Sequence, residues 1–446
     1  MSASEHLLKI KKEIAESFPN FEANATKAWR KVVTEIAQAA EQVVAAGPEY
    51  IPQVKFSEVA TLSSERISEI KRKGTVVIKD VVDDTQAAGW KTSLEEFVKA
   101  NPTGIQGFPE GNLQFFQLYW TRPQVEARSH PNMLATCAWL NNLYNSPPEA
   151  NLEGVDLSTP LTYADRFRIR HPGGQWGAHP PHVDGGTIER WEDPVFRSCF
   201  NDILSGNWRS HDPYDLSGRL NARASIYHRP NQASIFRSFQ GWLAISETGP
   251  TRGTLKVFPD VLLSNAYLIL RPFFRSTVSP DAKDYLNTDN WKFGAYIPPL
   301  PQNYTNSIKD ISTPDFPGLH VRDGGYSGPK PTPEEHPHML LDKMMTSVPE
   351  VSPGDAVFWH CDVVHSVEPE HLGTVDSAVM YIPAVPSTPM NQAYVEKQRE
   401  TFLKGVTPPD FPKVSVDEAD LVGVGKVDDI LSPMGRRAMG FPISVT

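Results

Sequence analysis

The sequence has few cysteines, no long apolar run and no excess of basic residues, and each of these features excludes a class of protein. Only three cysteines, Cys137, Cys199 and Cys361, occur among 446 residues, and none forms a C-x-x-C pair. This odd, widely spaced set argues against a disulfide framework and against a structural zinc site, and it fits a reducing compartment. No window approaches the roughly 18 consecutive apolar residues that a membrane-spanning helix requires.

Charge and the first residues narrow the expected partners and location. The chain carries 43 Lys and Arg against 53 Asp and Glu, a formal net charge of -10. An acidic chain of this kind does not favour the phosphate backbone of a nucleic acid as a partner. The N-terminal residues contain no apolar core of a signal peptide and no small-residue cleavage site, so secretion is not expected. We therefore expect a cytoplasmic protein with no nucleic-acid or membrane partner.

Proline is abundant, at 40 of 446 residues, and marks a chain rich in loops and strand ends. The N-terminal region is the exception. There, apolar residues recur near a 3.6-residue period on both sides of Pro19, which predicts helices up to Gly47. The following patterns predict a helix over 62–73, a strand over 75–82 and a helix over about 85–100.

From about residue 160, short apolar or alternating runs follow one another between Pro, Gly, Asn and Asp. They cover 166–170, 224–228, 241–246, 254–258, 356–359, 363–367 and 378–382. Short strands separated by turn signals predict a sandwich or a barrel. Two Pro-rich stretches, about 260–300 and 300–350, are predicted to run over the surface or to form part of a lid. A helix is predicted over 391–404.

These patterns together predict an α+β protein in three parts. A mainly helical part covers 1–160, a β core with long insertions covers 161–385, and a helical C-terminal extension covers 386–446. No clean linker separates them, so we expect one fused domain.

The segment with the clearest chemistry is His171–Gly186, which contains His182-Val-Asp184. Residues i and i+2 of a strand point to the same face, so this imidazole and this carboxylate converge on one point. A cation there lacks only a third ligand to complete the two-His-one-carboxylate set of non-haem Fe(II) oxygenases. That set leaves positions open for a cosubstrate and dioxygen. The alternative is a surface histidine beside an Asp-Gly turn.

A second segment, Val351–Pro369, supplies candidates for the third ligand. Its residues predict a Pro-Gly-Asp turn, an apolar strand, a second turn and a second strand that His365 ends. Such a hairpin can bring His365 back beneath the first pair. His360 is a competing candidate, but we expect it at the hairpin turn, either beside the ligands or at the surface. His179, flanked by Pro180, is expected in a loop rather than among the ligands.

The order of these features resembles the phytanoyl-CoA-hydroxylase-like Fe(II)/2-oxoglutarate-dependent dioxygenases. Within that superfamily the chain is similar to the DUF1479 family, and the similarity covers most of its length. The residues that carry it include Tyr163–Gly173, His182–Trp191, Phe236–Trp242, Leu270–Phe274 and Gln398–Phe411. The resemblance implies a double-stranded β-helix, which is a cupin-like jelly roll, as the core.

The resemblance also implies roles for single residues. His182, Asp184 and His365 correspond to the iron ligands, and Trp242 lies on a strand that lines the 2-oxoglutarate pocket. One feature departs from the superfamily, in which an Arg shortly after the distal His binds the far carboxylate of 2-oxoglutarate. Asp376 stands near that place in this chain.

A buried carboxylate needs a cationic partner, preferably one that makes two hydrogen bonds to it. Arg168 or Arg170, on the first strand of the core, can supply it, because alternation is expected to point one inward and the other outward. Arg237, before the next core strand, and Arg399, on the C-terminal helix, are further candidates. Asp376 itself could instead hold such an Arg or bind an amine of the substrate.

We therefore expect an Fe(II)/2-oxoglutarate-dependent oxygenase that uses O2 to hydroxylate a C–H bond of a small molecule. Segments 105–125, 187–235 and 260–345 are expected to form the lid and the substrate walls. Two other classes remain open. The missing Arg would favour a catalytically silent metal-binding jelly roll, such as a sensor, and a cupin-like metal-dependent hydrolase or isomerase would need no 2-oxoglutarate. Oxygen-dependent formation of succinate would separate the oxygenase from both.

Overall fold

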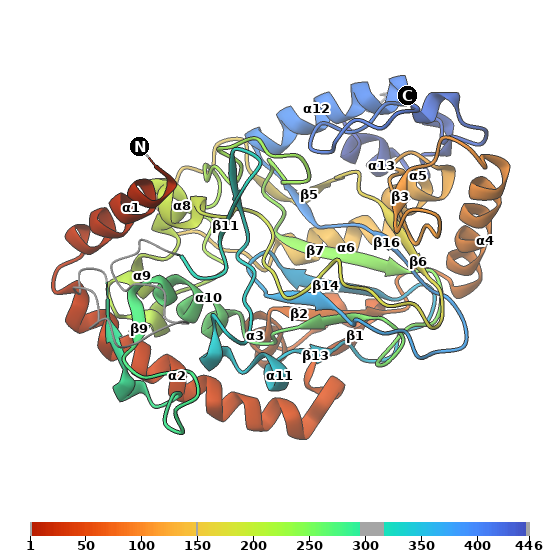
Figure 1. Cartoon of the computed structure of the whole chain (residues 1–446). Coiled ribbons are helices and arrows are strands. Elements are labelled where there is room, and N and C mark those ends of the chain that lie inside the picture. The colour runs from red at the N-terminus through yellow and green to blue at the C-terminus, as the bar shows by residue number, and fades with distance from the viewer. Residues whose placement is uncertain (1, 149, 295–315, 443–446) are drawn as a thin grey trace.

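The computed structural model describes residues 2–148, 150–294 and 316–442, which form a mixed α+β fold (Figure 1). The longer helices lie toward the two ends of the chain and in one central insertion: α1 Ala3–Ser17, α2 Phe21–Ala46, α3 Ser64–Lys73, α4 Asp84–Ala100, α5 Arg122–Ser129, α6 Pro131–Asn141, α10 Val261–Leu270, α12 Pro389–Lys404 and α13 Pro433–Ala438. Short helices occupy the insertions between strands: α7 Glu189–Glu192, α8 Pro194–Ser198, α9 Asn201–Leu204 and α11 Leu341–Met344.

The largest sheet has eight strands, which pair antiparallel except for β1 with β2. Their spatial order is β1 Gln53–Lys55, β2 Thr75–Lys79, β14 Ala356–His360, β7 Phe239–Ala244, β16 Ser377–Tyr381, β6 Phe167–Arg170, β4 Phe115–Phe116 and β3 Gly107–Phe108. Every residue of β14 and β7 is buried. Burial on both faces explains why these strands read as continuous apolar runs rather than as alternating ones.

A second antiparallel sheet supplies one side of the site described below. Its three strands, in spatial order, are β13 Thr346–Ser347, β8 Leu255–Val257 and β15 His365–Val367. Three two-stranded sheets complete the strands: β9 Phe274–Ser276 with β10 Trp291–Phe293, β11 His320–Arg322 with β12 Gly325–Ser327, and β5 Asp156–Leu161 with β17 Val385–Ser387.

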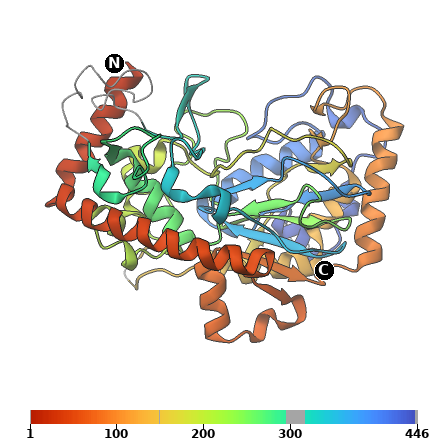
Figure 2. The same cartoon turned by 60° about the horizontal axis from the view of Figure 1, so that its bottom comes forward.

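Two large apolar clusters divide the interior. One lies around the eight-stranded sheet, and the other lies between α2 and α10. Figures 1 and 2 show α2 along one side of the molecule, away from α12. In the second cluster the indole of Trp29 on α2 stacks on Phe274, with ring centroids 4.6 Å apart and planes 8° apart. The second cluster thus attaches the N-terminal helices to the central insertion, the segment that contains α10.

Most of the predicted elements are confirmed, and their ends have local causes. The helix predicted over 62–73 is α3, which begins where the Ser63 side chain accepts a hydrogen bond from the Arg66 amide (3.3 Å). It ends at Gly74, whose φ of 66° is the left-handed conformation that glycine adopts without strain. A Cβ at this position would also lie 2.8 Å from the side chain of Val363.

Two of the predicted elements are wrong, the second of them only in part. Residues 224–228 form no strand, because side chains satisfy their backbone. The Ile226 amide donates to Glu189 (3.2 Å), and the Ala224 carbonyl accepts from Gln232 (2.7 Å). The stretch over 260–300 lies at the surface only in part, because residues 275–290 are partly or fully exposed but the stretch begins with α10, in which every residue is buried. The proline content concealed this helix, and residues 295–315 of the predicted lid lie outside the described residues.

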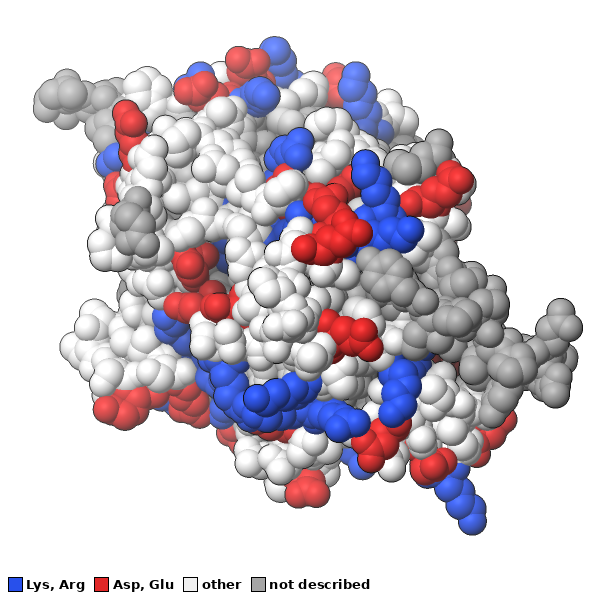
Figure 3. All heavy atoms as spheres, turned by 90° about the vertical axis from the view of Figure 1, so that its left-hand side faces the viewer, with Lys and Arg blue, Asp and Glu red and all other residues white. Residues whose placement is uncertain are grey.

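Figure 3 shows the face beside α1 and α2, where basic side chains gather in a band with acidic ones at its edges. Ion pairs link α2 to its neighbours, since Arg30 pairs with Asp289, and Glu35 pairs with Arg209 of the short helix η3 Trp208–Ser210. Within the described ranges, no helix combines the length and the apolar character that crossing a membrane requires.

Candidate metal centre

Three predicted ligands, His182, Asp184 and His365, lie together at the edge of the three-stranded sheet. One ligand atom from each lies within 4.8 Å of the others. Asp184 Oδ1 is 3.8 Å from His182 Nε2, and Asp184 Oδ2 is 3.6 Å from His365 Nε2. Two backbone hydrogen bonds between His182 and His365, each 2.9 Å, form a single β-bridge. His182 therefore belongs to a bridge rather than to a strand, and His365 begins β15 rather than ending it.

Both imidazoles are oriented through their Nδ1 atoms. His182 Nδ1 lies 2.7 Å from the Pro180 carbonyl, and His365 Nδ1 lies 3.0 Å from the Val363 carbonyl. A carbonyl can only accept, so each Nδ1 carries a proton, and in the neutral form of each ring Nε2 presents its lone pair toward Asp184. Metal-binding histidines are held in this way, with the second nitrogen donating to a carbonyl or carboxylate.

The protonation states also suit a cation. Burial, with His365 beside it, lowers the pKa of His182 to about 4. Enclosure raises the pKa of Asp184, but the neighbouring rings of His182 and His365 outweigh it and hold that pKa well below its usual range. At neutral pH the site therefore offers a neutral imidazole and an ionised carboxylate, which are the forms that bind metals.

Two further residues hold Asp184 in place. With the Gln240 amide in the orientation that satisfies both of its ends, its nitrogen donates to Asp184 Oδ2 (2.7 Å) and its oxygen accepts from Trp359 Nε1 (3.3 Å). Arg190 donates to the backbone carbonyls of Asp184 (3.1 Å) and Gly185 (3.2 Å). Sequence reasoning missed both. Gln240 could have been found, because it precedes the predicted pocket residue Trp242 by two positions on the same strand.

The three candidate ligands face a cavity of about 480 Å3. Strands of both antiparallel sheets line it, together with the 179–187 loop and the β11–β12 hairpin. Its aromatic lining residues are Phe115, Tyr163, Trp242, Trp359, Tyr381 and Phe411. Each segment expected to form a wall, over 105–125, 187–235 and 260–345, contributes lining residues. Within the aromatic run that begins at Phe115, that first ring faces the cavity and Trp120 packs in the core.

The arginines considered for a carboxylate partner fall into two groups, since Arg168 and Arg237 line the cavity and Arg170 does not. The expected alternation of Arg168 and Arg170 is wrong, because residues two apart on β6 share a face. Both donate to the carbonyl of Gly253, at 3.3 and 3.2 Å. Arg170 also donates to three other backbone carbonyls, so both of its Nη atoms are already occupied.

The guanidinium of Arg168 is buried like that of Arg170, but it makes fewer hydrogen bonds. The side chain is 2% exposed, and within the described residues its Nε and Nη1 have no hydrogen-bond partner. Unpaired polar atoms of a buried cation are costly, so this guanidinium is suited to an anionic ligand in the cavity.

Two other candidate residues, Arg399 and Asp376, do not line the cavity. Arg399 donates to the carbonyl of Gly440 in the C-terminal region. Asp376 pairs with His171 Nδ1 (2.9 Å) and with Lys91 (3.7 Å). Its ion-pair partners are therefore a histidine and a lysine rather than the arginine that it was expected to hold.

His179 lines the cavity beside the candidate ligands and accepts a hydrogen bond from Trp176 Nε1 (2.8 Å) at its Nδ1. Burial lowers its pKa to about 3. His360, in contrast, is fully buried at the end of β14, where its ring lies 4.7 Å from that of Tyr214. It does not lie at the surface, but it does begin the turn after β14, since its carbonyl accepts from the Val363 amide (2.9 Å).

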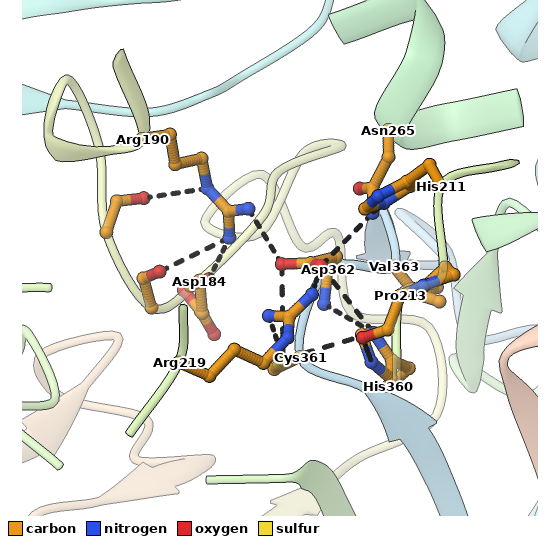
Figure 4. Close-up of polar contacts among 12 residues, drawn as sticks. Asp184, Arg190, His211, Pro213, Arg219, Asn265, His360, Cys361, Asp362 and Val363 are labelled. Atoms are coloured by element: carbon orange, nitrogen blue, oxygen red, sulfur yellow. Dashed lines mark hydrogen bonds and ion pairs between the residues drawn. The ribbon is translucent and has the colours of Figure 1, made fainter. Parts of the chain in front are cut away.

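His360, Cys361 and Asp362 form a second group with metal-ligand spacing. Figure 4 shows two guanidinium groups converging on Asp362. Arg190 pairs with its Oδ1 at 2.7 Å and Arg219 with its Oδ2 at 2.5 Å, and all three side chains are buried. Two fixed positive charges already neutralise this carboxylate, so a cation is better accommodated at Asp184.

Comparison with known proteins places the chain in a family. A model of the Gig2-like family matches residues 3–441. The Escherichia coli (strain K12) protein YbiU is 27% identical over 424 residues, which cover 92% of this chain and 90% of that protein. The crystal structure of the E. coli protein JW0805 is 26% identical, with a TM-score of 0.77 and coverage of 99% and 98% of the two chains.

A fungal structure is also similar. The crystal structure of Candida albicans GlcNAc Inducible Gene 2, GIG2 (DUF1479), is 30% identical to this chain, with a TM-score of 0.82. The match covers 98% of this chain and 89% of that one. The family match extends over nearly the whole sequence, and the chain therefore belongs to the Gig2-like family (DUF1479).

Proposed function

We propose that this protein is a non-haem Fe(II)/2-oxoglutarate-dependent oxygenase that oxidises, by hydroxylation, a C–H bond of a small molecule. The observation that carries the proposal is the convergence of His182, Asp184 and His365 at the wall of a half-closed cavity. Two imidazole nitrogens and one carboxylate form a set suited to Fe(II) with open coordination positions. Lining residues from both antiparallel sheets support a jelly-roll core around the site.

The donor atoms fit the metal without rearrangement of the groups that hold them. In the neutral form of each ring Nε2 is unprotonated, because Nδ1 donates to a carbonyl. Gln240 donates to one oxygen of Asp184 and so leaves the other free to act as a ligand. When bound, iron and 2-oxoglutarate would activate O2, whose two oxygen atoms would enter the hydroxylated substrate and the succinate formed, together with CO2, from the cosubstrate.

Arg168 is the residue we assign to the far carboxylate of 2-oxoglutarate. Its two unpaired nitrogens could supply the two donors that a buried carboxylate needs. It lies on β6, next to β16, where Arg168 pairs with Val379. An arginine on this neighbouring strand would replace the one missing after the distal histidine. The aromatic side chains Trp242 and Tyr381 would exclude water from the same end of the cavity.

Anaerobic titration with 2-oxoglutarate tests the proposal. Fe(II)-loaded protein is expected to develop the weak visible charge-transfer band of an iron chelate, and His182→Ala is expected to lose it. Arg168→Met is expected to weaken 2-oxoglutarate binding by at least about tenfold while iron remains bound. A saturating band is the positive result, and oxygen-dependent succinate formation would then follow.

The same titration separates the proposed oxygenase from the two rival classes, which are the silent metal-binding protein and the metal-dependent hydrolase. If iron binds at His182 and no band appears, the oxygenase proposal fails, and a silent metal-binding protein or a metal-dependent hydrolase gains support. A hydrolase would also work with redox-inert Zn2+, whereas oxygen activation would not.

A further inference from the structure

The cavity contains more positive charge than its own acidic residues can balance. Its cationic lining residues are Arg166, Arg168, Arg229, Arg237, Arg322 and Lys330, and its acidic ones are Asp165, Asp184 and Asp323. Asp165 pairs with Arg166 (2.9 Å), and Asp323 pairs with Arg229 (3.4 Å) and Arg322 (3.3 Å). Asp184 faces the two histidines.

Three cations remain after these pairs are assigned. In the part of the chain that the structure describes, Arg168, Arg237 and Lys330 have no ion pair with an acidic side chain. The proposed function assigns one of them, Arg168, to 2-oxoglutarate. A single dianionic cosubstrate places one carboxylate there and the other at the metal, so two cations still lack an anion.

These two cations lie beside the metal centre. The amide of Val183, between two candidate ligands, donates to the carbonyl of Pro329 (2.9 Å), which places Lys330 next to the ligand loop. Arg237 also lines a small adjoining cavity with Asp184 and Gln240. The guanidinium of Arg237 lies over the ring of Tyr163, 5.4 Å from its centroid, so it is oriented by an uncharged partner.

Holding unpaired cations in a half-closed cavity has a cost that a ligand can offset. Burial, followed by the nearby Arg322 and Arg229, lowers the pKa of Lys330. Lys330 and these two arginines thus repel one another, and an anion beside Lys330 would relieve that repulsion and supply charge-assisted hydrogen bonds. Aromatic side chains around them would contact an organic part of the same molecule.

We propose that the substrate is an organic anion, a carboxylate or a phosphate monoester, whose charged group lies between Arg237 and Lys330 beside the metal centre. This inference rests on the proposed function, because it names the substrate class of the same site. The anionic group would anchor the molecule, and the aromatic walls would direct a C–H bond toward the metal.

Calorimetric titration of Zn(II)-loaded protein at saturating 2-oxoglutarate tests the inference, because redox-inert zinc prevents turnover. The probes are benzoate, phenyl phosphate and the uncharged benzamide. At least one of the two anions is expected to bind about tenfold more tightly than benzamide, and the tighter of them identifies the carboxylate or phosphate class. Equal binding of benzamide and both anions would overturn the inference.

Variants locate the charge that causes the preference. Lys330→Met and Arg237→Met are each expected to reduce the preference for the anion about tenfold, whereas Lys330→Arg should retain it. Lys99→Met, which removes an exposed charge at the end of α4, is the matched control and should bind as the unmodified protein does. An anion preference that survives both methionine variants would contradict the assignment.

The two proposals fail in different ways. If Lys330→Met and Arg237→Met weaken 2-oxoglutarate and leave the probes unaffected, the cations serve the cosubstrate and the inference is wrong. If 2-oxoglutarate does not bind at all, the proposed oxygenase fails. The same probe titrations without it still decide whether an organic anion occupies this part of the cavity.

Discussion

Asp362 lies outside the main cavity, yet it connects the metal centre to the interior of the protein. Its carboxylate pairs with Arg190 and Arg219, and it accepts a hydrogen bond from Asn265 (3.1 Å). Arg190 then donates to the carbonyl of Asp184 (3.1 Å). A single buried carboxylate therefore holds the arginine that holds the backbone of the candidate ligand.

Asp362→Asn is expected to destabilise the protein strongly. The change leaves Arg190 and Arg219 buried without their countercharge, and breaking a buried pair in this way costs about 3–5 kcal/mol. Urea denaturation measures the loss in the free energy of unfolding. The control Asp289→Asn breaks the exposed pair with Arg30, in which the two side chains are 51% and 70% exposed. It should change stability by no more than about 1 kcal/mol, and equal effects of the two variants would refute the argument.

Gln240→Leu is expected to weaken metal binding without removing a ligand. It deletes the donor to Asp184 Oδ2 and leaves the side-chain volume nearly unchanged. Loss of a hydrogen-bond partner of a ligand typically lowers metal affinity about 10–100-fold. Titration with Co2+, followed by its visible absorption, measures the affinity. Gln86→Leu, on the exposed face of α4, should leave it unchanged, and a Gln240→Leu affinity equal to that control would contradict the assigned contact.

At the scale of elements, the pairing of α2 with α10 shows how a helix without an exposed face is covered. All ten residues of α10 are buried, so other elements must cover it on every side. α2 covers one side through Trp29, whose ring also lies 5.0 Å from that of Tyr267 on α10. The N-terminal helices are therefore part of the core around the central insertion.

Trp29→Ala is expected to lower the free energy of unfolding by about 3–5 kcal/mol, because it removes a fully buried indole and leaves a cavity. Val44→Ala on the same helix is the control. Its side chain is 60% exposed, so its effect should stay within about 0.5 kcal/mol. Urea denaturation followed by far-ultraviolet circular dichroism compares them, and a small effect at Trp29 would mean that α2 packs only loosely.

At the scale of the whole molecule, several buried histidines make the fold sensitive to acid. Burial lowers the pKa of His211 and His338 to about 4 and that of His360 to about 3, from an ordinary value of 6.5. Between those values the unfolded chain binds more protons than the folded protein does. The contribution of these residues is therefore present above pH 6.5 and is lost as the pH falls toward 4.

The urea midpoint should fall as the pH is lowered from 7.5 to 5. At pH 5 each of these histidines lowers the free energy of unfolding by up to about 2 kcal/mol, since one pKa unit corresponds to about 1.4 kcal/mol. His338→Gln can still donate to the Leu286 carbonyl and should make the pH dependence shallower. The exposed His320→Gln should leave the dependence unchanged. A midpoint independent of pH in the unmodified protein would exclude the explanation.

Local patterns predicted much of this structure because their causes are local. The helix over 62–73 begins at a capping serine and ends at a glycine, and both signals can be read directly in the sequence. The buried strands could likewise be predicted from short apolar runs in the sequence. The failures have one physical origin, since α10 and the 224–228 segment depend on partners distant in sequence, such as Trp29 and Glu189.

The candidate site divides in the same way. His182 and Asp184 are two residues apart, so their proximity follows from the chain itself, and a hairpin argument suffices to bring His365 toward them. The sequence alone could not choose among the arginines, because the distinction lies in which guanidinium finds backbone carbonyls. Folding occupies Arg170 with four carbonyls and leaves Arg168 facing the cavity with two unpaired nitrogens, a difference that only tertiary packing can create.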